Sequence, residues 1–190
     1  MTDPSDASAW PSYPIGPRES VFALGVVSVN YASLEFVLGA VFANVTGLTM
    51  NAATSLLPNI SNHIRLQVMR DALSVIAWPT TVKGGITHFT NGFEILAENR
   101  NLLMHSNLVA GVNDRIALYK SNRRGETILT VIDPEELRRV ADDMMAYRGY
   151  GSILANLIAS PSTLRPAILP PKPPLPRKLN YSSQPQRSNR

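Results

Sequence analysis

The sequence predicts an all-α protein: an up-down bundle of four to five helices, with a small β-hairpin inserted before the last helix and disordered termini. Three observations support this prediction. Apolar residues recur at helical spacing over most of the chain, strict alternation replaces that spacing at about residues 115–132, and proline gathers at both ends. Only three of the 15 prolines lie between residues 18 and 160.

Proline and charge divide the 190 residues into three parts. We expect residues 1–17 and 161–190 to be disordered, because proline supplies no N–H group to a helix or a sheet. One folded domain then spans residues 18–160. The C-terminal part holds six basic and no acidic residues, whereas the rest holds 12 basic and 14 acidic ones. The net charge of +4 therefore belongs to a tail that we expect to be dispensable for folding.

The tail also has a conformational preference of its own. Residues 170–178 are rich in proline with PxxP spacing, which favours the extended polyproline II helix. Such a segment can dock in a groove on a partner. The alternative is a disordered extension without a specific partner, and the composition favours that interpretation.

The first helix is predicted to end at Gly47, a residue typical of helix C-termini. Its apolar residues step alternately by three and four, and a second apolar stripe runs beside them. The first stripe is Leu24, Val27, Tyr31, Leu34, Leu38, Val41 and Val45; the second is Phe22, Val26, Val29, Phe36 and Ala40. A helix that is apolar on two faces is central in a bundle or lies between a core and a partner subunit.

We expect this helix not to span a membrane. Asn30, Ser33 and Glu35 interrupt its apolar run, and a carboxylate at the centre of a membrane span costs roughly 2.5–3.5 kcal/mol. The N-terminus carries acidic residues and no basic segment before an apolar run, unlike a signal peptide. We therefore predict a cytoplasmic protein.

Two further helices are predicted before the hairpin. The second runs from about Asn59 to Trp78, with Ser61 as its cap and Pro79 at its end. The third runs from about Thr87 to Leu108, and Arg100 occupies one position of its apolar register.

The alternating segments 115–120 and 126–132 predict the two strands of the hairpin. The last helix begins at Asp133-Pro134, with the aspartate as N-cap and proline in the first helical position.

Most sequence motifs of catalysis are missing. The chain has no P-loop, no dinucleotide fingerprint, no GxSxG and no HExxH. With three histidines and no cysteine it has few metal ligands, so we predict neither a metal site nor a cofactor. His63 and His88 lie alone among apolar and hydroxyl residues, and we interpret both as structural or surface histidines.

His105 has a different setting. On a helix, Glu98, Asn101 and His105 share one polar face with Glu94, and the long side chain of Arg100 can reach that face. An imidazole can accept the proton of a ribose 2′-hydroxyl and return it to a leaving oxygen. A guanidinium matches phosphate oxygens, and an amide can orient either partner. This residue set therefore predicts phosphodiester cleavage without a metal.

The spacing Arg100-Asn101-x-x-x-His105 resembles the RNxxxH motif of the HEPN superfamily, and the resemblance covers roughly residues 20–158. It implies a HEPN-like bundle and a metal-independent endoribonuclease (a hydrolase or nuclease) of toxin–antitoxin or antiviral defence systems. It also implies a homodimer with a composite active site, an RNA substrate and, as a further partner, an antitoxin or regulatory protein. Arg100, Asn101 and His105 map onto the catalytic positions. Glu35 and Glu98 are weaker, supporting candidates, and the hairpin departs from a minimal bundle.

Two alternatives remain open at this point. The first is a catalytically silent HEPN-like module that binds RNA or protein, and the second is a structural helical interaction protein. In either case Arg100 can pair with Glu94 or Glu98, and His105 can cap the helix C-terminus.

The hairpin turn offers a separate basic cluster. Lys120, Arg123 and Arg124 gather there, and we expect them to bind RNA phosphates, although a solvated turn explains them equally well.

Overall fold

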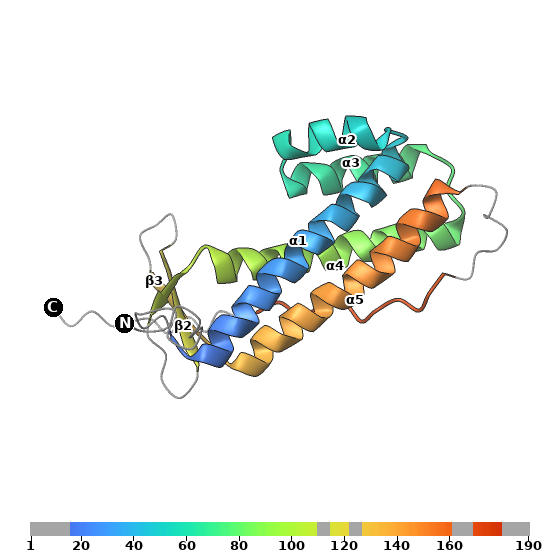
Figure 1. Ribbon diagram of the computed structural model, residues 1–190. Coiled ribbons are helices and arrows are strands. Elements are labelled where there is room, and N and C mark those ends of the chain that lie inside the picture. Colours follow the sequence, from blue (N-terminus) through green and yellow to red (C-terminus); the bar gives the residue numbers. More distant parts are fainter. Residues whose placement is uncertain (1–15, 110–114, 122–126, 161–168, 180–190) are drawn as a thin grey trace, which may run out of the picture.

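The computed structural model describes residues 16–109, 115–121, 127–160 and 169–179, and this part of the chain is mostly helical. Its elements, in chain order, are α1 (Arg18–Thr46), α2 (Met50–Leu56), the 3-10 turn η2 (Leu57–Asn59), α3 (Asn62–Val75), α4 (Thr80–Met104), β1 (Asn107–Val109), β2 (Ile116–Ser121), β3 (Thr127–Ile132) and α5 (Pro134–Ala159). Figure 1 shows α1, α4 and α5 running together, with α2 and α3 at one end and the sheet at the other. The predicted helical protein with strands before the last helix is confirmed.

Two side-chain amides of α1, the buried Asn30 and the half-buried Asn44, fix how this helix lies against α5. Asn30 of α1 donates from Nδ2 to the carbonyl oxygen of Ala141 (3.0 Å), and Asn44 donates to that of Ala155 (2.9 Å). Sliding one helix along the other would break both bonds, and an unpaired buried amide such as that of Asn30 costs about 1–3 kcal/mol. The first helix ends where predicted, at Gly47, whose φ of 71° lies in the left-handed region that favours glycine.

Two glycines allow α4 and α5 to approach each other closely. A Cβ atom at Gly92 of α4 would lie 1.9 Å from Cε1 of Tyr147, and one at Gly151 of α5 would lie 2.4 Å from Cε2 of Phe89. Each helix therefore supplies a glycine that receives an aromatic ring of the other. Both rings are fully buried in the core.

The middle helices differ from the prediction at their ends. Ser61 caps α3 as predicted, since its Oγ accepts from the N–H of Ile64 (3.3 Å). The chain before it forms α2, which the sequence does not reveal because only Ala53 of this short helix is buried. The helix α4 begins at Thr80 rather than Thr87, and it ends at Met104 rather than at Leu108.

The predicted hairpin is present as part of a larger sheet. The strands β2 and β3 pair antiparallel, with Ile116 opposite Ile132. A third strand, β1, pairs with β2 and was not predicted, because its three residues are too few to show alternation. Asp133 occupies the N-cap position of α5, but its carboxylate pairs with Nε of Arg115 (2.5 Å) instead of capping the helix.

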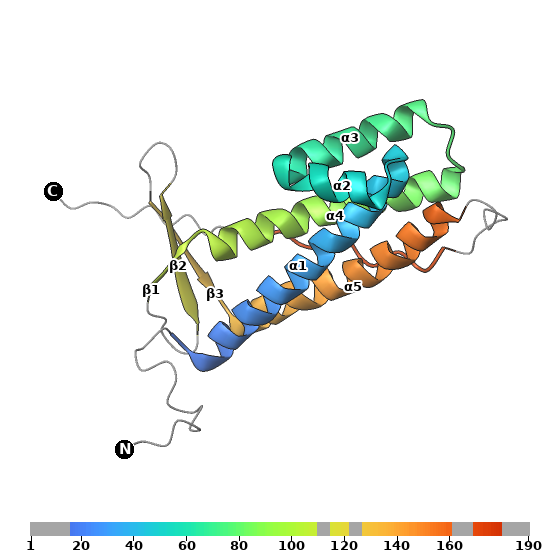
Figure 2. The same ribbon diagram turned by 45° about the horizontal axis from the view of Figure 1, so that its top comes forward.

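Residues 169–179, here called the C-terminal strap, lie along α4 and α5 without helix or strand structure (Figure 2). Pro176 and Leu179 are buried. The prediction that residues 161–190 are disordered therefore does not hold for the strap, which is packed against the body. The strap is held by side chains about 80 residues earlier in the chain, such as Asn99. The composition of the segment itself cannot predict contacts with residues so far away in the sequence. The rest of residues 161–190 lies outside the described residues.

Candidate active site

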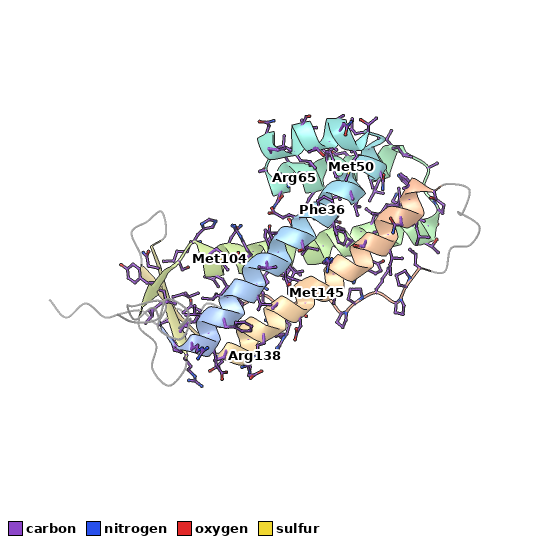
Figure 3. The ribbon with its side chains drawn as sticks, viewed as in Figure 1. Phe36, Met50, Arg65, Met104, Arg138 and Met145 are labelled. Atoms are coloured by element: carbon purple, nitrogen blue, oxygen red, sulfur yellow. The ribbon has the colours of Figure 1, made fainter. Side chains whose placement is uncertain are left out.

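The three residues of the predicted catalytic set lie at the C-terminal end of α4. His105 is the C-cap residue, and its backbone N–H donates to the carbonyl oxygen of Asn101 (3.2 Å). Met104, labelled in Figure 3, marks this end of the helix, next to the sheet.

Arg100 brings the three side chains together. Its Nη1 lies 3.0 Å from Nε2 of His105 and 3.3 Å from Oδ1 of Asn101. A guanidinium only donates hydrogen bonds, so Nε2 of His105 is the acceptor and carries no proton in this arrangement. The imidazole and the amide are exposed, and Arg100 is half-buried. The structure therefore gathers an imidazole, an amide and a guanidinium on one accessible surface.

Tyr31 of α1 lies beneath this cluster. The Cζ atom of Arg100 is 5.3 Å from the centroid of the Tyr31 ring, and a cation over an aromatic face gains about 0.5–2 kcal/mol. This contact explains how Arg100 occupies a position of the apolar register of α4. Burial, and secondly the negative charge of Glu35, raise the pKa of Tyr31 well above its ordinary value. The hydroxyl is therefore protonated at neutral pH.

Glu35, one turn after Tyr31, is connected to the cluster through Asn62 at the start of α3. The Nδ2 group of Asn62 donates to the hydroxyl of Tyr31 (2.9 Å) and to Oε1 of Glu35 (2.8 Å). Among the described ion pairs there is none between Glu35 and Arg100. Glu35 is thus linked to the candidate site through Asn62 and the Tyr31 ring rather than by direct contact.

The acidic residues of α4 are directed elsewhere. Glu98 pairs with Nζ of Lys178 in the strap (2.6 Å), and Glu94 pairs with Arg70 of α3 (2.7 Å). The carboxylate of Glu98 is thus paired with the strap, and its supporting role at the site stays a prediction.

An open groove of about 400 Å³ lies beside the cluster, and Asn101 belongs to both. Its lining residues come from α4, β2 and the strap: Glu98, Asn99, Asn101, Leu102, Lys120, Lys178 and Leu179. Lys120 of the predicted basic cluster is therefore next to the candidate site. Arg123 and Arg124 lie outside the described residues.

Sequence reasoning missed Tyr31 and Asn62 as parts of this site. Tyr31 had a signal, because it stands four residues before Glu35 on the same helix face, but its spacing also fits the apolar stripe of α1. Asn62 had no such signal in the sequence, because it only follows the capping serine and meets Glu35 after α3 folds back on α1.

Two further properties of the chain concern metal binding and insertion into a membrane. Within the described ranges, no three His, Asp or Glu side chains gather where they could hold a metal ion. The helix α1 is long and apolar enough to cross a membrane, with a mean hydropathy of 1.7 over its most apolar window, of which 33% is buried. Core helices of soluble proteins and signal sequences share this property, and the absence of a membrane span stays a prediction.

Comparisons with known proteins found no match to a family model, to a curated protein or to a solved structure. The fold and the site thus define a helical protein with a small antiparallel sheet and an exposed Arg–Asn–His cluster at the end of α4.

Proposed function

We propose that this chain is a HEPN-like, metal-independent endoribonuclease that acts as a homodimer in a defence or toxin–antitoxin setting. The observation that carries the proposal is the 3.0 Å contact between Nη1 of Arg100 and Nε2 of His105 at an exposed helix end. A group that binds phosphate oxygens beside a proton acceptor is what transfer of a phosphodiester to a neighbouring hydroxyl requires.

In the proposed reaction the ribose 2′-hydroxyl attacks the phosphorus, and His105 takes its proton at Nε2. The guanidinium of Arg100 stabilises the charge that develops on the non-bridging oxygens. The bond to the 5′-oxygen breaks, and this oxygen receives a proton from an imidazolium. The products are a 2′,3′-cyclic phosphate and a free 5′-hydroxyl, and Asn101 orients the imidazole or the ribose.

The free chain needs one rearrangement before this reaction. Arg100 occupies the Nε2 lone pair of His105, so the imidazole cannot accept a proton there until the guanidinium moves. A bound phosphate offers the guanidinium a charged partner in place of a neutral one. Substrate binding would therefore free Nε2 of His105 to accept the proton.

The first test is cleavage of RNA by the purified chain in the presence of EDTA. We expect cleavage to continue and to leave 2′,3′-cyclic phosphate and 5′-hydroxyl ends. Cleavage that EDTA abolishes, or products with 5′-phosphate ends, would contradict the proposal. Binding without cleavage would favour the silent module instead, and neither binding nor cleavage would favour the interaction protein.

An exposed apolar stripe on α1 supports the dimer. Phe22, Val29 and Phe36 are spaced by seven residues, so they lie along one side of the helix, and Phe22 and Phe36 are 74% and 72% exposed. Contiguous exposed apolar side chains are typical of interaction surfaces. A two-fold contact through this stripe would bury it and bring two copies of the Arg100–His105 pair into one assembly.

We expect Phe36→Asp to convert the dimer to a monomer, because the contact would bury an unpaired carboxylate on each side of the two-fold axis. Light scattering should give the mass of two chains for the wild type and of one chain for the variant, with a matching loss of cleavage. Val75→Asp is the control, since Val75 is 84% exposed on α3, away from the stripe. A wild type that is monomeric at micromolar concentration would contradict the composite site.

Lys120 should contribute to RNA binding through charge. Each phosphate contact adds about 0.7 to the slope of log affinity against log salt for a single strand. We therefore expect Lys120→Gln to reduce that slope by about 0.7, measured by fluorescence anisotropy with a non-cleavable RNA. Lys83→Gln, a loss of the same charge at the opposite end of α4, should leave the slope unchanged. Equal slopes in all three proteins would remove Lys120 from the binding surface.

A further inference from the structure

The C-terminal strap is held by two separate hydrogen-bonding stations on α4. At the first, Nε2 of His88 lies 2.8 Å from the carbonyl oxygen of Pro173. At the second, the Asn99 amide binds the strap backbone twice: Nδ2 donates to the carbonyl oxygen of Arg177, and Oδ1 accepts from the N–H of Leu179, each at 2.9 Å. Both stations recognise backbone groups, which an extended chain presents and a helix does not.

The spacing of the stations matches a polyproline II chain. His88 and Asn99 are eleven residues apart on one helix, which corresponds to about 16 Å at 1.5 Å per residue. The Asn99 amide brackets Lys178, which lies five residues after Pro173, or about 15 Å at the polyproline II rise of 3.1 Å. The two stations therefore fix both the conformation and the register of the segment between them.

His88 is itself held in place by aromatic rings. Its ring stacks on Tyr147 at 5.6 Å and meets the edge of Tyr150 at 5.8 Å, and Nε2 also lies 3.0 Å from the hydroxyl of Tyr147. Asn99 is only 2% exposed, and both polar atoms of its amide form hydrogen bonds with the strap. A prearranged acceptor and donor set of this kind is typical of a recognition site.

The groove is also complementary in charge and shape. Carboxylates of the body meet both basic residues at the end of the strap, with Glu98 2.6 Å from Lys178 and Glu136 3.2 Å from Arg177. Leu179 is 6% exposed and belongs to the hydrophobic core cluster. The two stations thus bind the extended backbone of the segment, the carboxylates bind its basic side chains, and the apolar pocket receives Leu179.

We propose that the groove between α4 and α5 is a peptide-binding site for a basic, proline-rich segment, and that its occupant is residues 169–179 of this same chain. The strap docks by recognition of its sequence and does not need its covalent link to α5 to remain in place. The docked strap also supplies Lys178 and Leu179 to the groove beside Asn101, so the peptide site and the candidate active site share a wall. This inference concerns docking alone and does not require RNA cleavage.

The test is to break the covalent link. A protease site is inserted between Ser160 and Leu169 in the full chain, the purified protein is cleaved, and the products are separated by gel filtration in low salt. We expect the fragment that carries the strap to co-elute with the body, and labelled peptide 169–179 to exchange into the groove.

Variants on both sides of the contact make the result specific. Asn99→Asp keeps the acceptor for Leu179 but loses the donor to Arg177, and we expect peptide affinity to fall at least about tenfold. Leu179→Ser changes the strap and leaves the sequence of the body as it is, so it tests the apolar contact of Leu179 with the core, and it should release the fragment. Asn51→Asp, the same change at an exposed site on α2, is the matched control and should retain the fragment.

Immediate separation of the wild-type fragment would overturn the proposal, whether or not circular dichroism shows that the body stays folded. Equal retention of the fragment by the Asn99→Asp and Asn51→Asp proteins would overturn it as well, because co-elution would then not depend on the amide station.

Discussion

His105→Ala should reduce RNA cleavage by about 10²–10⁴-fold, the usual contribution of a positioned acid–base group. The substitution removes the proposed proton acceptor and leaves Arg100 on the ring of Tyr31, so RNA binding should persist. His105 is exposed at the end of α4, and its loss should change the thermal unfolding temperature little. The measurement is the single-turnover cleavage rate in EDTA as a function of pH.

The controls separate the chemistry from loss of charge or fold. His63→Ala removes an exposed imidazole from α3 and should cleave at the wild-type rate. Arg100→Lys keeps the positive charge but not the paired donors that fit phosphate oxygens, and we expect it also to lose most activity. Full activity of the His105→Ala protein would remove the imidazole from the reaction. Activity of wild type without a falling limb on at least one side of neutral pH would weaken the same assignment.

Gly92→Ala should destabilise the bundle by about 1–3 kcal/mol, the usual cost of inserting a methyl group into a packed core. The new Cβ atom would lie 1.9 Å from Cε1 of Tyr147, whose side chain is fully buried and has no free space to enter. The separation of α4 and α5 must therefore increase. At about 2–4 °C per kcal/mol for a chain of this size, the unfolding temperature should fall by several degrees in a calorimetric scan.

The same substitution at Gly149 should have the opposite sign. A Cβ atom there meets nothing within 4 Å, and the residue is exposed in the interior of α5. Alanine at such a position stabilises a helix by about 0.5–1 kcal/mol relative to glycine. If Gly92→Ala raised the unfolding temperature or left it unchanged, the close approach of α4 and α5 at Gly92 would be in error.

The parts of the fold that the sequence predicts well are those that carry a long repeating pattern. The stripes of α1, the alternation in β2 and β3 and the proline at the start of α5 were each sufficient to place an element. The helix α2 buries only Ala53, and β1 is three residues long, so neither repeats anything over enough positions to be recognised. The strap carries PxxP spacing, but its composition predicts disorder because the partners that hold it lie on α4.

The candidate site follows the same division. Arg100, Asn101 and His105 lie within one helical turn and a half, and the length of the Arg100 side chain lets it reach the face that Asn101 and His105 share. Tyr31 and Asn62 join them only through the packing of α1 and α3, which no spacing within one element specifies. The spacing of Glu98 places it on the same helix face as His105, but its carboxylate pairs with Lys178 of the strap, a contact that the spacing does not predict.

The pairing of α1 with α5 has a consequence for synthesis of the chain. The hydrogen bonds from Asn30 and Asn44 each join residues 111 positions apart, so α1 leaves the ribosome long before its main partner exists. At about 5–20 residues per second the delay is roughly 5–20 s. During that interval the side of α1 that packs on α5 lacks its main partner on the nascent chain. Translation order thus leaves this side of α1 open to aggregation or to capture by chaperones until α5 has been made.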